Sequence, residues 1–521
     1  MNFPGARWKM GVPLALLMIC LGCGGGSSSS SSSSQQTPVN DPPAPGPTDA
    51  QYLTQAEVQS VVSATAAAAS DSLVIAVSDR AGRVLAVFRK AGAPATAVGN
   101  FSVVVDANEL AVALARTAAF FSNDQAPLSS RTVRFLSGIH FPPGIMNTSN
   151  APLYGIENTN RGCNLSDDFA PGQSVPPART MSGPTGLGII TGKVDVTDSN
   201  QTAVNPGGVP IFKNGEVVGG VGVAGSTPEV SEFAAYSGAT QSLTPLPTFP
   251  APGAVVINGI TVPFVQQTSL PSGFSPDPNY TGSYVAGPVD SPGAVPEGYL
   301  VTAQAGPLGG LTAAEVQSIV TNAVNTANVT RAVIRLPIGQ RTKMVISVAD
   351  LDGTVLALYR MPDATVFSID VAVSKARNMT YVDSQQLNPA DMPGVPVGTA
   401  STNRTIGFGA QPLYPPGIDG SPNGPFFQLY VNDVKNACSQ GSQPPGPKQS
   451  GIVFFPGSVG LYRNGQLIGG LGVSGDGVDQ DDYVTSGGSL GFEAPLNIRA
   501  DQIIDQDVRL PYLKFPRDPT D

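Results

Sequence analysis

Histidine is nearly absent from this sequence, since His140 is the only one among 521 residues. A single imidazole argues against a histidine-rich metal cluster. The chain also shows no Cys-x-x-Cys motif, no serine–histidine–aspartate order and no paired carboxylates in a shared block. Basic residues are few as well, with 28 Lys and Arg against 38 Asp and Glu. The resulting charge of −10 argues against nucleic-acid binding, and the sequence predicts neither a catalytic centre nor a metal site.

Apolar residues make up 41% of the chain and charged residues only 13%. A disordered chain would have more charge and fewer apolar residues, so packed cores are expected. The 60 glycines and 49 prolines predict long loops between the folded elements. At roughly 100–200 residues per domain, a chain of this length is typical of about two to four domains.

The N-terminus is predicted to be a lipoprotein signal peptide, residues 1–22. Arg7 and Lys9 precede an apolar run over 11–21, which is shorter than the about 20 residues that a membrane-spanning helix needs. The run ends at Leu21-Gly22-Cys23, which resembles a bacterial lipobox, so Cys23 is the expected site of lipid attachment. The alternative is a plain cleaved signal that leaves a free cysteine.

A Ser/Pro-rich stretch over residues 23–50 follows and has no apolar periodicity, so a disordered tether is expected. The predicted location is the bacterial cell envelope, with the chain attached to the membrane through its N-terminal lipid. Gly24 rather than an aspartate follows Cys23 and favours the outer membrane or cell surface, if the cell has two membranes.

Five blocks of sequence occur twice in the same order, which predicts a tandem duplication. The pairs are 53–69 with 311–327, 73–94 with 344–365, 113–121 with 374–382, 129–145 with 401–418, and 207–225 with 457–475. The predicted domains span 51–240 and 311–494. Between them lies a Pro/Gly-rich linker, 241–310, with one candidate strand near 254–265, and a C-terminal tail covers 495–521.

Each copy is predicted to contain a helix, a hairpin, a helix, a long loop, a second hairpin and a final helix. The pairs Thr54/Glu57 and Thr312/Glu315 are typical of capping boxes at helix starts. Asn-Gly pairs at 214–215 and 464–465 predict tight hairpin turns. The expected class is therefore α+β, with an antiparallel sheet flanked by helices in each copy.

The glycines at 220–225 and 470–475 match G-x-G-x-x-G. A dinucleotide site needs this pattern between a parallel strand and a helix, with an acidic residue about 20 positions later. Here the glycines run through the second arm of a hairpin, and no suitable acid follows them. The pattern favours close packing of a strand against a helix.

Both copies resemble the GlcG/HbpS-type haem-binding family, also known as the DUF336 domain. The resemblance is carried by ARTAA and GGVPIFKNGEVVGGVGVAG in the first copy, and by VADLDGTVLALYRM, SIDVAVSKARNMT and LIGGLGVSGDGVDQDD in the second. It covers most of 53–235 and 311–492. It implies tandem profilin-like domains that oligomerise, binding of haem or a corrinoid, and no securely shared enzymatic activity.

His140 is the only protein imidazole that could ligate haem iron, and Leu413 occupies its position in the second copy. A matched pair of histidine-ligated sites is therefore excluded. Tyr414, Met146 or Met361 are alternative iron ligands, because tyrosine and methionine ligate haem in other proteins. A lone histidine is more often a surface or hydrogen-bonded residue, and that alternative stays open.

Arg131 and Arg404 occupy matching positions before the two Pro-Pro loops. Each guanidinium could pair with a ligand carboxylate through a bidentate contact. The alternative is that each arginine ties its loop to the body by donating to backbone carbonyl groups.

Cys163 and Cys438 each lie in the long loop of one copy. Disulfides form in exported proteins, so a bridge between the copies is predicted if these loops face one another. Two unpaired thiols are the alternative.

The leading expectation is an exported, membrane-anchored protein that binds haem or a related tetrapyrrole. The alternative is a non-catalytic interaction module at the cell envelope, in the form of a fused pseudo-dimer or a homo-oligomer. Enzymatic turnover of a small acid has almost no support from individual residues.

Overall fold

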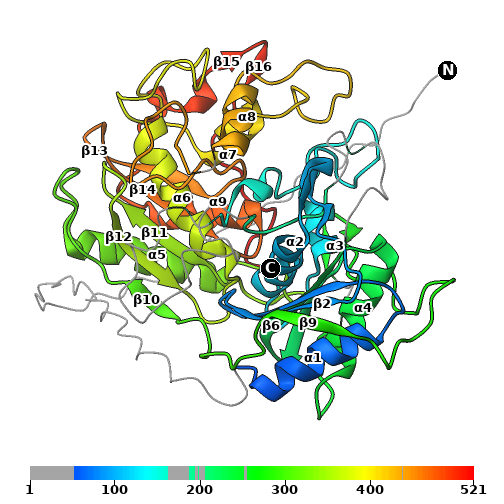
Figure 1. Ribbon diagram of the computed structural model, residues 1–521. Helices are drawn as coiled ribbons and strands as arrows, with labels where there is room; N and C mark the ends of the chain where they lie inside the picture. Colours follow the sequence, from blue (N-terminus) through cyan, green and yellow to red (C-terminus); the bar gives the residue numbers. More distant parts are fainter. Residues whose placement is uncertain are drawn as a thin grey trace, which may run out of the picture. The chain divides into compact units, whose positions relative to one another are not determined.

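Two antiparallel sheets of five strands each, both flanked by helices, form the framework of the chain (Figure 1). This computed structural model describes residues 52–161, 163, 187–193, 198, 206–251, 255–436 and 438–521. The predicted signal peptide, the tether and Cys23 lie outside these residues. The predicted α+β class is confirmed. Within the described ranges, no helix combines the length and apolar character needed to cross a bilayer.

The first sheet lies between one helix on one face and two helices on the other. Its strand order is β5 (Gly208–Lys213), β6 (Glu216–Ala224), β1 (Val74–Asp79), β2 (Val84–Lys90) and β9 (Gly282–Ala286). Alternate residues of β1 face opposite layers. Val74 and Ala76 pack with α2 (Ala107–Phe121), whereas Ile75 and Val77 pack with α1 (Gln55–Ala67) and α4 (Pro228–Gln241).

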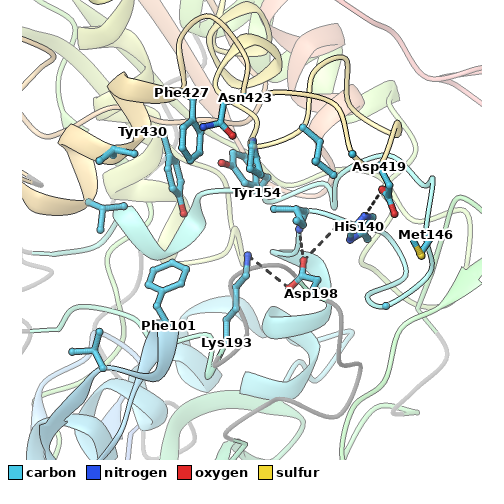
Figure 2. Close-up of a pocket in the computed structure, with 18 of the residues that line it drawn as sticks. Phe101, His140, Met146, Tyr154, Lys193, Asp198, Asp419, Asn423, Phe427 and Tyr430 are labelled. Carbon is cyan, nitrogen blue, oxygen red and sulfur yellow. Dashed lines mark hydrogen bonds and ion pairs between the residues drawn. The ribbon is translucent and has the colours of Figure 1, made fainter.

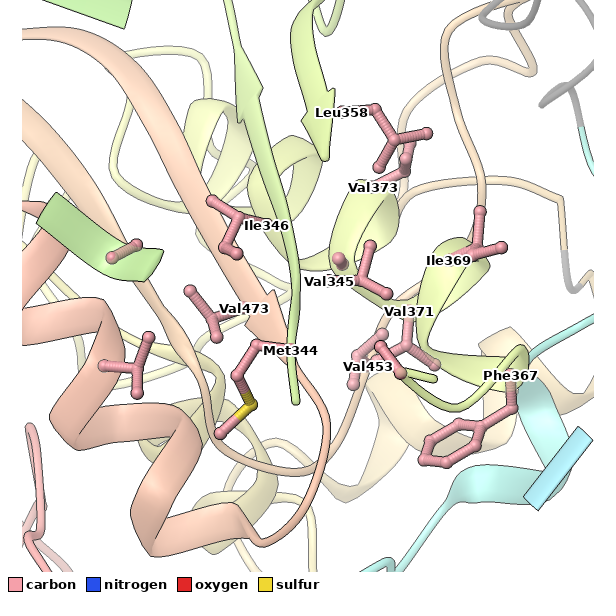
Figure 3. Packing of buried hydrophobic residues seen from close by; sticks show 14 of the residues in the cluster. Met344, Val345, Ile346, Leu358, Phe367, Ile369, Val371, Val373, Val453 and Val473 are labelled. Carbon is pink, nitrogen blue, oxygen red and sulfur yellow. The ribbon is translucent and has the colours of Figure 1, made fainter. Parts of the chain in front are cut away.

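The second sheet repeats this arrangement. Its strand order is β13 (Ser458–Arg463), β14 (Gln466–Ser474), β11 (Val345–Ala349), β12 (Val355–Arg360) and β10 (Gly298–Val301). Helix α6 (Phe367–Val382) packs against β14, and α5 (Ala313–Val329) packs against α9 (Val478–Gly488). Figure 3 shows Val345 directed toward Val371 of α6, and Ile346 on the other side of the strand, near Val473.

The predicted helix starts and turns are confirmed in both halves. The backbone N–H of Thr54 donates to Glu57 Oε2 at 2.9 Å, and that of Thr312 donates to Glu315 Oε2 at 2.8 Å. Asn214 and Asn464 both have φ 53°, and the glycine that follows each also has positive φ. These are the conformations that a two-residue hairpin turn requires.

The glycines at 220–225 and 470–475 allow the close packing of a strand against a helix that their pattern predicts. A β-carbon on Gly222 would collide with the backbone of α2 at Ala111, and one on Gly472 would collide with α6 at Ala372. Each central strand therefore approaches its covering helix more closely than any side chain would allow.

The segment predicted as a linker, 241–310, contributes an edge strand to each sheet, because β9 pairs with β2 and β10 pairs with β12. Within the predicted 254–265 strand region lie the short strands β7 (Val256–Ile257) and β8 (Ile260–Thr261). In the tail, β15 (Ile504–Asp505) and β16 (Val508–Arg509) form another short hairpin. The segment is thus part of the sheets as well as a connection between them.

Further elements lie near the ends of the sheets. Strands β3 (Thr96–Val98) and β4 (Val104–Asp106) form a small hairpin before α2. The long loop of the first half contains α3 (Ser130–Leu136), and that of the second half contains α7 (Asn403–Gly409) and α8 (Phe427–Lys435). The sequence patterns did not predict these three helices.

Candidate functional site

A cavity of about 860 Å³ lies between the long loops of the two halves (Figure 2). One wall comes from residues within 101–198 and the other from 412–435. Its volume is within the roughly 300–1,000 Å³ that is common for small-molecule sites. Most of its lining is apolar or aromatic, and includes Phe101, Val103, Ile139, Met146, Tyr154, Leu413, Phe427, Tyr430, Val431 and Val434.

Three aromatic rings form a nearly parallel wall of this cavity. The rings of Tyr154 and Tyr430 stack with centroids 5.2 Å apart and planes inclined by 23°. The ring centroids of Phe427 and Tyr430 are 5.9 Å apart, and the ring planes are inclined by 17°. Helix α8 places these last two residues three positions apart, on the same helix face. The stack therefore gives one side of the cavity an aromatic, apolar surface.

The tyrosine hydroxyls of this wall are occupied by the protein itself. The Tyr154 hydroxyl donates to the carbonyl oxygen of Ala410 at 3.1 Å, and the Tyr430 hydroxyl donates to Glu157 Oε1 at 2.9 Å. Burial raises the pKa of both phenols well above the ordinary value. Both side chains are therefore neutral at physiological pH.

Lys193 brings a positive charge to the opposite side of the cavity. Its side chain is only 1% exposed, and its Nζ lies 3.9 Å from Asp198 Oδ1. That oxygen also pairs with Arg134 Nη2 at 3.0 Å, and Oδ2 of Asp198 accepts a hydrogen bond from the backbone N–H of Ile139. Within the part of the chain that the structure describes, the Lys193 ammonium donates no hydrogen bond. Its Nζ also lies 5.8 Å from the centroid of the Phe101 ring. A buried cation that donates no hydrogen bond to the described residues favours a negatively charged ligand group.

His140 lines the cavity, and its imidazole connects the two halves. The Nε2 atom lies 2.8 Å from Asp419 Oδ1, and this hydrogen bond lowers the pKa of the Asp419 carboxyl. Because a carboxylate only accepts, Nε2 must carry the proton and donate it. The Nδ1 atom is buried and makes no hydrogen bond within the described residues.

Among the four ligand-binding residues predicted from sequence, only His140 lines this cavity. Arg131 makes a bidentate contact with Glu232 of α4, at 2.6 and 2.9 Å. Arg404 contacts Asp482 at 2.5 Å and Asp479 at 2.6 Å, both on α9. Protein carboxylates therefore already occupy both guanidinium groups, and neither arginine lines this cavity.

Tyr414 also lies away from the cavity lining. Its hydroxyl donates to the carbonyl oxygen of Asp505 at 3.2 Å, and burial raises its pKa to about 12. Met361 belongs to the core, where its sulfur accepts from the backbone N–H of Met344 at 3.3 Å. Of the alternative iron ligands, Met146 alone lines the cavity.

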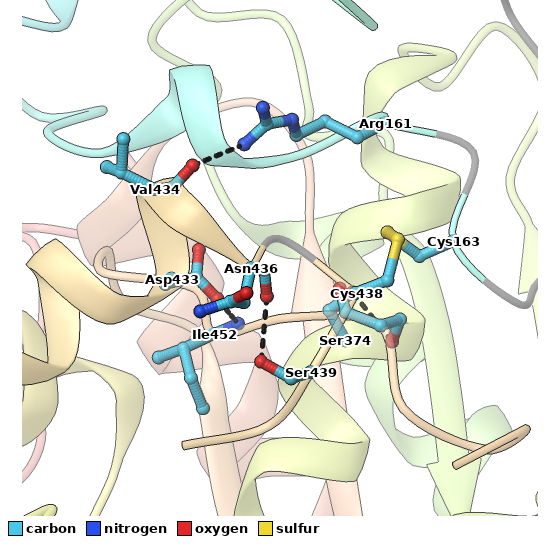
Figure 4. The surroundings of a disulfide bond; sticks show 10 residues. Arg161, Cys163, Ser374, Asp433, Val434, Asn436, Cys438, Ser439 and Ile452 are labelled. Atoms are coloured by element: carbon cyan, nitrogen blue, oxygen red, sulfur yellow. Dashed lines mark hydrogen bonds between the residues drawn. A yellow bond between two sulfur atoms is a disulfide. The ribbon is translucent and has the colours of Figure 1, made fainter. Parts of the chain in front are cut away.

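Cys163 and Cys438 form a disulfide, with their Cα atoms 5.1 Å apart (Figure 4). Next to it, Arg161 Nη1 donates to the carbonyl oxygen of Val434 at 3.2 Å. Val434 lies at the end of α8 and lines the cavity. The bridge therefore ties the loop of the first half to the helix that carries the aromatic wall.

A second cavity of about 630 Å³ is lined in part by charged residues that form ion pairs with protein groups. Arg404 and Lys514 both contact Asp479, and Asp481 contacts Lys375. Within the described residues, no group of three or more His, Cys, Asp or Glu side chains is placed to hold a metal ion. The larger cavity is the better candidate site, because it combines an aromatic stack with the charge of Lys193.

Sequence reasoning did not identify Phe101, Tyr154, Lys193, Phe427 or Tyr430 as site residues. The spacing of Phe427 and Tyr430 was the one available signal, since it places two aromatic rings on one face of a helix. The other three are separated from α8 by more than two hundred residues, and only the folded chain brings them to it.

Comparison with known proteins finds similarity for part of this chain. A family model described as "Haem degrading protein HbpS-like" matches residues 311–488. The corrinoid adenosyltransferase PduO of Citrobacter freundii is 27% identical over 154 residues, which are 29% of this chain and 33% of PduO. The chain therefore spans about a third of the length of this curated relative.

Two solved structures are also similar. A Klebsiella pneumoniae protein, ORFY, assigned to the DUF336 family, is 21% identical with a TM-score of 0.23, and the match covers 35% of this chain and 90% of ORFY. A PduOC:heme complex has the same identity and TM-score, and the match covers 35% of this chain and 94% of that one.

Proposed function

We propose that this chain binds haem or a related tetrapyrrole in the cavity between its two halves. The observation that carries the proposal is the aromatic stack of Tyr154, Tyr430 and Phe427 in the cavity lining, opposite the buried Lys193. A tetrapyrrole is a large flat ring, and haem carries carboxylates at its edge. The match of 311–488 to an HbpS-like family described by haem degradation supports the same ligand class.

The residues of the cavity fit the ring and the carboxylates of haem. The aromatic wall can stack on one face of the ring, and the Lys193 ammonium can pair with a carboxylate. When bound, haem would supply an iron centre. The proposal is limited to binding and includes no catalytic step.

An absorbance titration with hemin tests this function. We expect a saturable shift of the Soret band in the full exported chain. Val431→Trp, on α8, should fill the cavity and weaken binding at least tenfold. Leu490→Trp is the matched control, because Leu490 is 60% exposed and outside the cavity lining. A titration without saturation, or equal effects of both substitutions, would contradict the proposal.

We also propose that the chain is exported and attached to the membrane through Cys23. The lipobox-like sequence supports this location, and so does the Cys163–Cys438 disulfide, because such bridges persist in oxidising compartments. Cys23→Ala should move the protein from the detergent-rich to the aqueous phase on Triton X-114 partition. A wild-type chain without an acyl mass on its first residue would contradict it.

We further propose that 51–240 and 311–494 are two copies of one profilin-like domain. The shared strand order of the two sheets supports this interpretation. An experimental structure in which the two sheets do not superpose would contradict it. The alternative function, a non-catalytic interaction module that self-associates, stays a prediction that light scattering after size exclusion would test.

A further inference from the structure

The residues of this cavity do not fit ligation of haem iron by the protein. His140 is the only imidazole in the chain. Its Nε2 donates to Asp419, and its Nδ1 is buried. For either nitrogen to reach an iron atom, the hydrogen bond between the halves must break or the ring must turn out of its packing.

The other candidate iron ligands do not replace the histidine. Tyr414 is engaged with Asp505, and Met361 lies in the core beside Met344. Met146 lines the cavity, but it is 69% exposed and lies on the loop side near Asp419 (Figure 2). The described lining therefore presents aromatic surface and the ammonium groups of Lys193 and Lys435, of which only Lys193 is buried, rather than a positioned ligand for a metal.

Lys193 is the polar group best placed to recognise a ligand. An ammonium group has three donors, and among the described residues its nearest carboxylate, that of Asp198, lies 3.9 Å away. That acid, Asp198, already pairs with Arg134 at 3.0 Å. A ligand carboxylate would give the buried cation a hydrogen-bonded counter-charge, whereas a neutral amide at the same place would accept a hydrogen bond without neutralising the charge.

We infer that this cavity recognises a tetrapyrrole as a flat carboxylic acid, through its ring face and one carboxylate held by Lys193, without ligation of its metal by the protein. This inference rests on the proposed function and specifies its ligand class. The preferred ligand is a porphyrin with free carboxylates, with or without iron. Corrinoids, whose ring edge carries amides, are disfavoured.

Titration of the full, disulfide-bonded chain with three probes tests the inference. Protoporphyrin IX and hemin should bind with dissociation constants within about threefold of each other, because the metal contributes little. The dimethyl ester of protoporphyrin IX should bind roughly tenfold more weakly, because it lacks the charge that Lys193 recognises. His140→Ala and Met146→Leu should change the affinities for hemin and for protoporphyrin IX by the same factor, because neither side chain ligates the iron.

Lys193→Met provides the matched protein variant. This variant should weaken binding of the free acid roughly tenfold and leave the affinity for the ester unchanged. The difference separates a direct contact from a general loss of structure. If Lys193→Met does not fold, the comparison of acid with ester on the wild-type chain still decides the question.

The outcomes distinguish the two proposals. Binding of hemin at least tenfold tighter than protoporphyrin IX, abolished by His140→Ala or Met146→Leu, would overturn the inference and leave the proposed function standing. Equal affinity for acid and ester would also overturn it. Absence of saturable binding by every probe would overturn the proposed function itself.

Discussion

Phe121 and Phe367 stack face to face where the two halves of the chain meet, with ring centroids 4.1 Å apart and planes inclined by 7°. Phe121 ends α2 and Phe367 begins α6, and both side chains are buried. The backbone reinforces this contact, because the N–H of Val366 donates to the carbonyl oxygen of Phe120 at 3.0 Å. The covering helices of the two sheets are thus joined directly.

Removal of one ring from this stack should destabilise the chain strongly. Phe367→Ala leaves a cavity opposite Phe121, and we expect a loss of about 3–5 kcal/mol in the free energy of unfolding by urea. Phe515→Ala is the control, because Phe515 is 47% exposed, and it should cost less than about 1 kcal/mol. Equal losses would show that the stack is not a principal contact between the halves.

The central glycines should tolerate no side chain. Gly472→Ala places a methyl group against the backbone of Ala372 and Ala376 in α6, and a backbone cannot rotate away as a side chain can. We expect a loss of at least about 1–3 kcal/mol in unfolding free energy. At Gly446 the nearest atom to an added methyl group is 3.5 Å away, so Gly446→Ala should have little effect. An unchanged unfolding free energy in Gly472→Ala would contradict the close approach of β14 to α6.

The buried pair Lys375–Asp481 can be exchanged for the uncharged residues that the first half of the chain has at the same positions. Lys375 Nζ lies 3.0 Å from Asp481 Oδ2, and burial raises the pKa of that carboxyl to about 7. The aligned residues of the first copy are Leu114 and Ser231. Asp481→Ser alone leaves an unpaired buried lysine and should cost about 3–5 kcal/mol.

The double variant Lys375→Leu/Asp481→Ser should be more stable than Asp481→Ser, because it removes both charges together. Chemical denaturation of both single variants and the double variant gives the coupling energy. Additive losses would show that the two groups do not act as a pair.

Acidity should affect the contact between the halves through Asp124. Burial, followed by the nearby Asp363, raises the pKa of Asp124 to about 6, whereas an unfolded aspartate titrates at about 3.9. Between these values the folded chain holds more protons than the unfolded chain. The contribution of Asp124 to the unfolding free energy therefore falls as the pH rises from about 4 to 6.

Asp124→Asn should remove this loss. Relative to wild type, we expect the variant to gain roughly 2–3 kcal/mol between pH 4 and pH 7, as measured by urea unfolding at several pH values. Asp507→Asn, at an exposed position, is the control and should show no pH-dependent gain. A constant difference between Asp124→Asn and wild type across this range would refute the assignment.

Reduction of the disulfide should weaken the chain and loosen the cavity. Cys163 and Cys438 are 275 residues apart in sequence, so their bridge restricts the unfolded chain strongly. We expect dithiothreitol to reduce the unfolding free energy by about 2–5 kcal/mol. The Cys163→Ala/Cys438→Ala variant should match the reduced wild type and show no response to the reductant. A response of that variant would point to an effect unrelated to this bridge.

Local patterns were sufficient to predict the repeated secondary structure. A threonine followed three residues later by glutamate satisfies N–H groups at a helix start, and Asn-Gly adopts the positive φ values of a tight turn. The edge strands β9 and β10 were missed, because they lie in a Pro/Gly-rich segment with weak strand patterns and depend on pairing with β2 and β12. Helices α3, α7 and α8 are short and lie within long loops, where periodicity is a poor guide.

The sequence alone determined the α+β class, the repeated order of elements and the limit of one histidine, because these follow from local chemistry and composition. Tertiary structure alone decided which side chains form the site. His140 contacts Asp419 across 279 residues, and Arg131 contacts Glu232 across 101. Such partners depend on how long loops pack over the sheets. That packing occupied the two predicted arginines with protein carboxylates and left Lys193 facing an aromatic cavity.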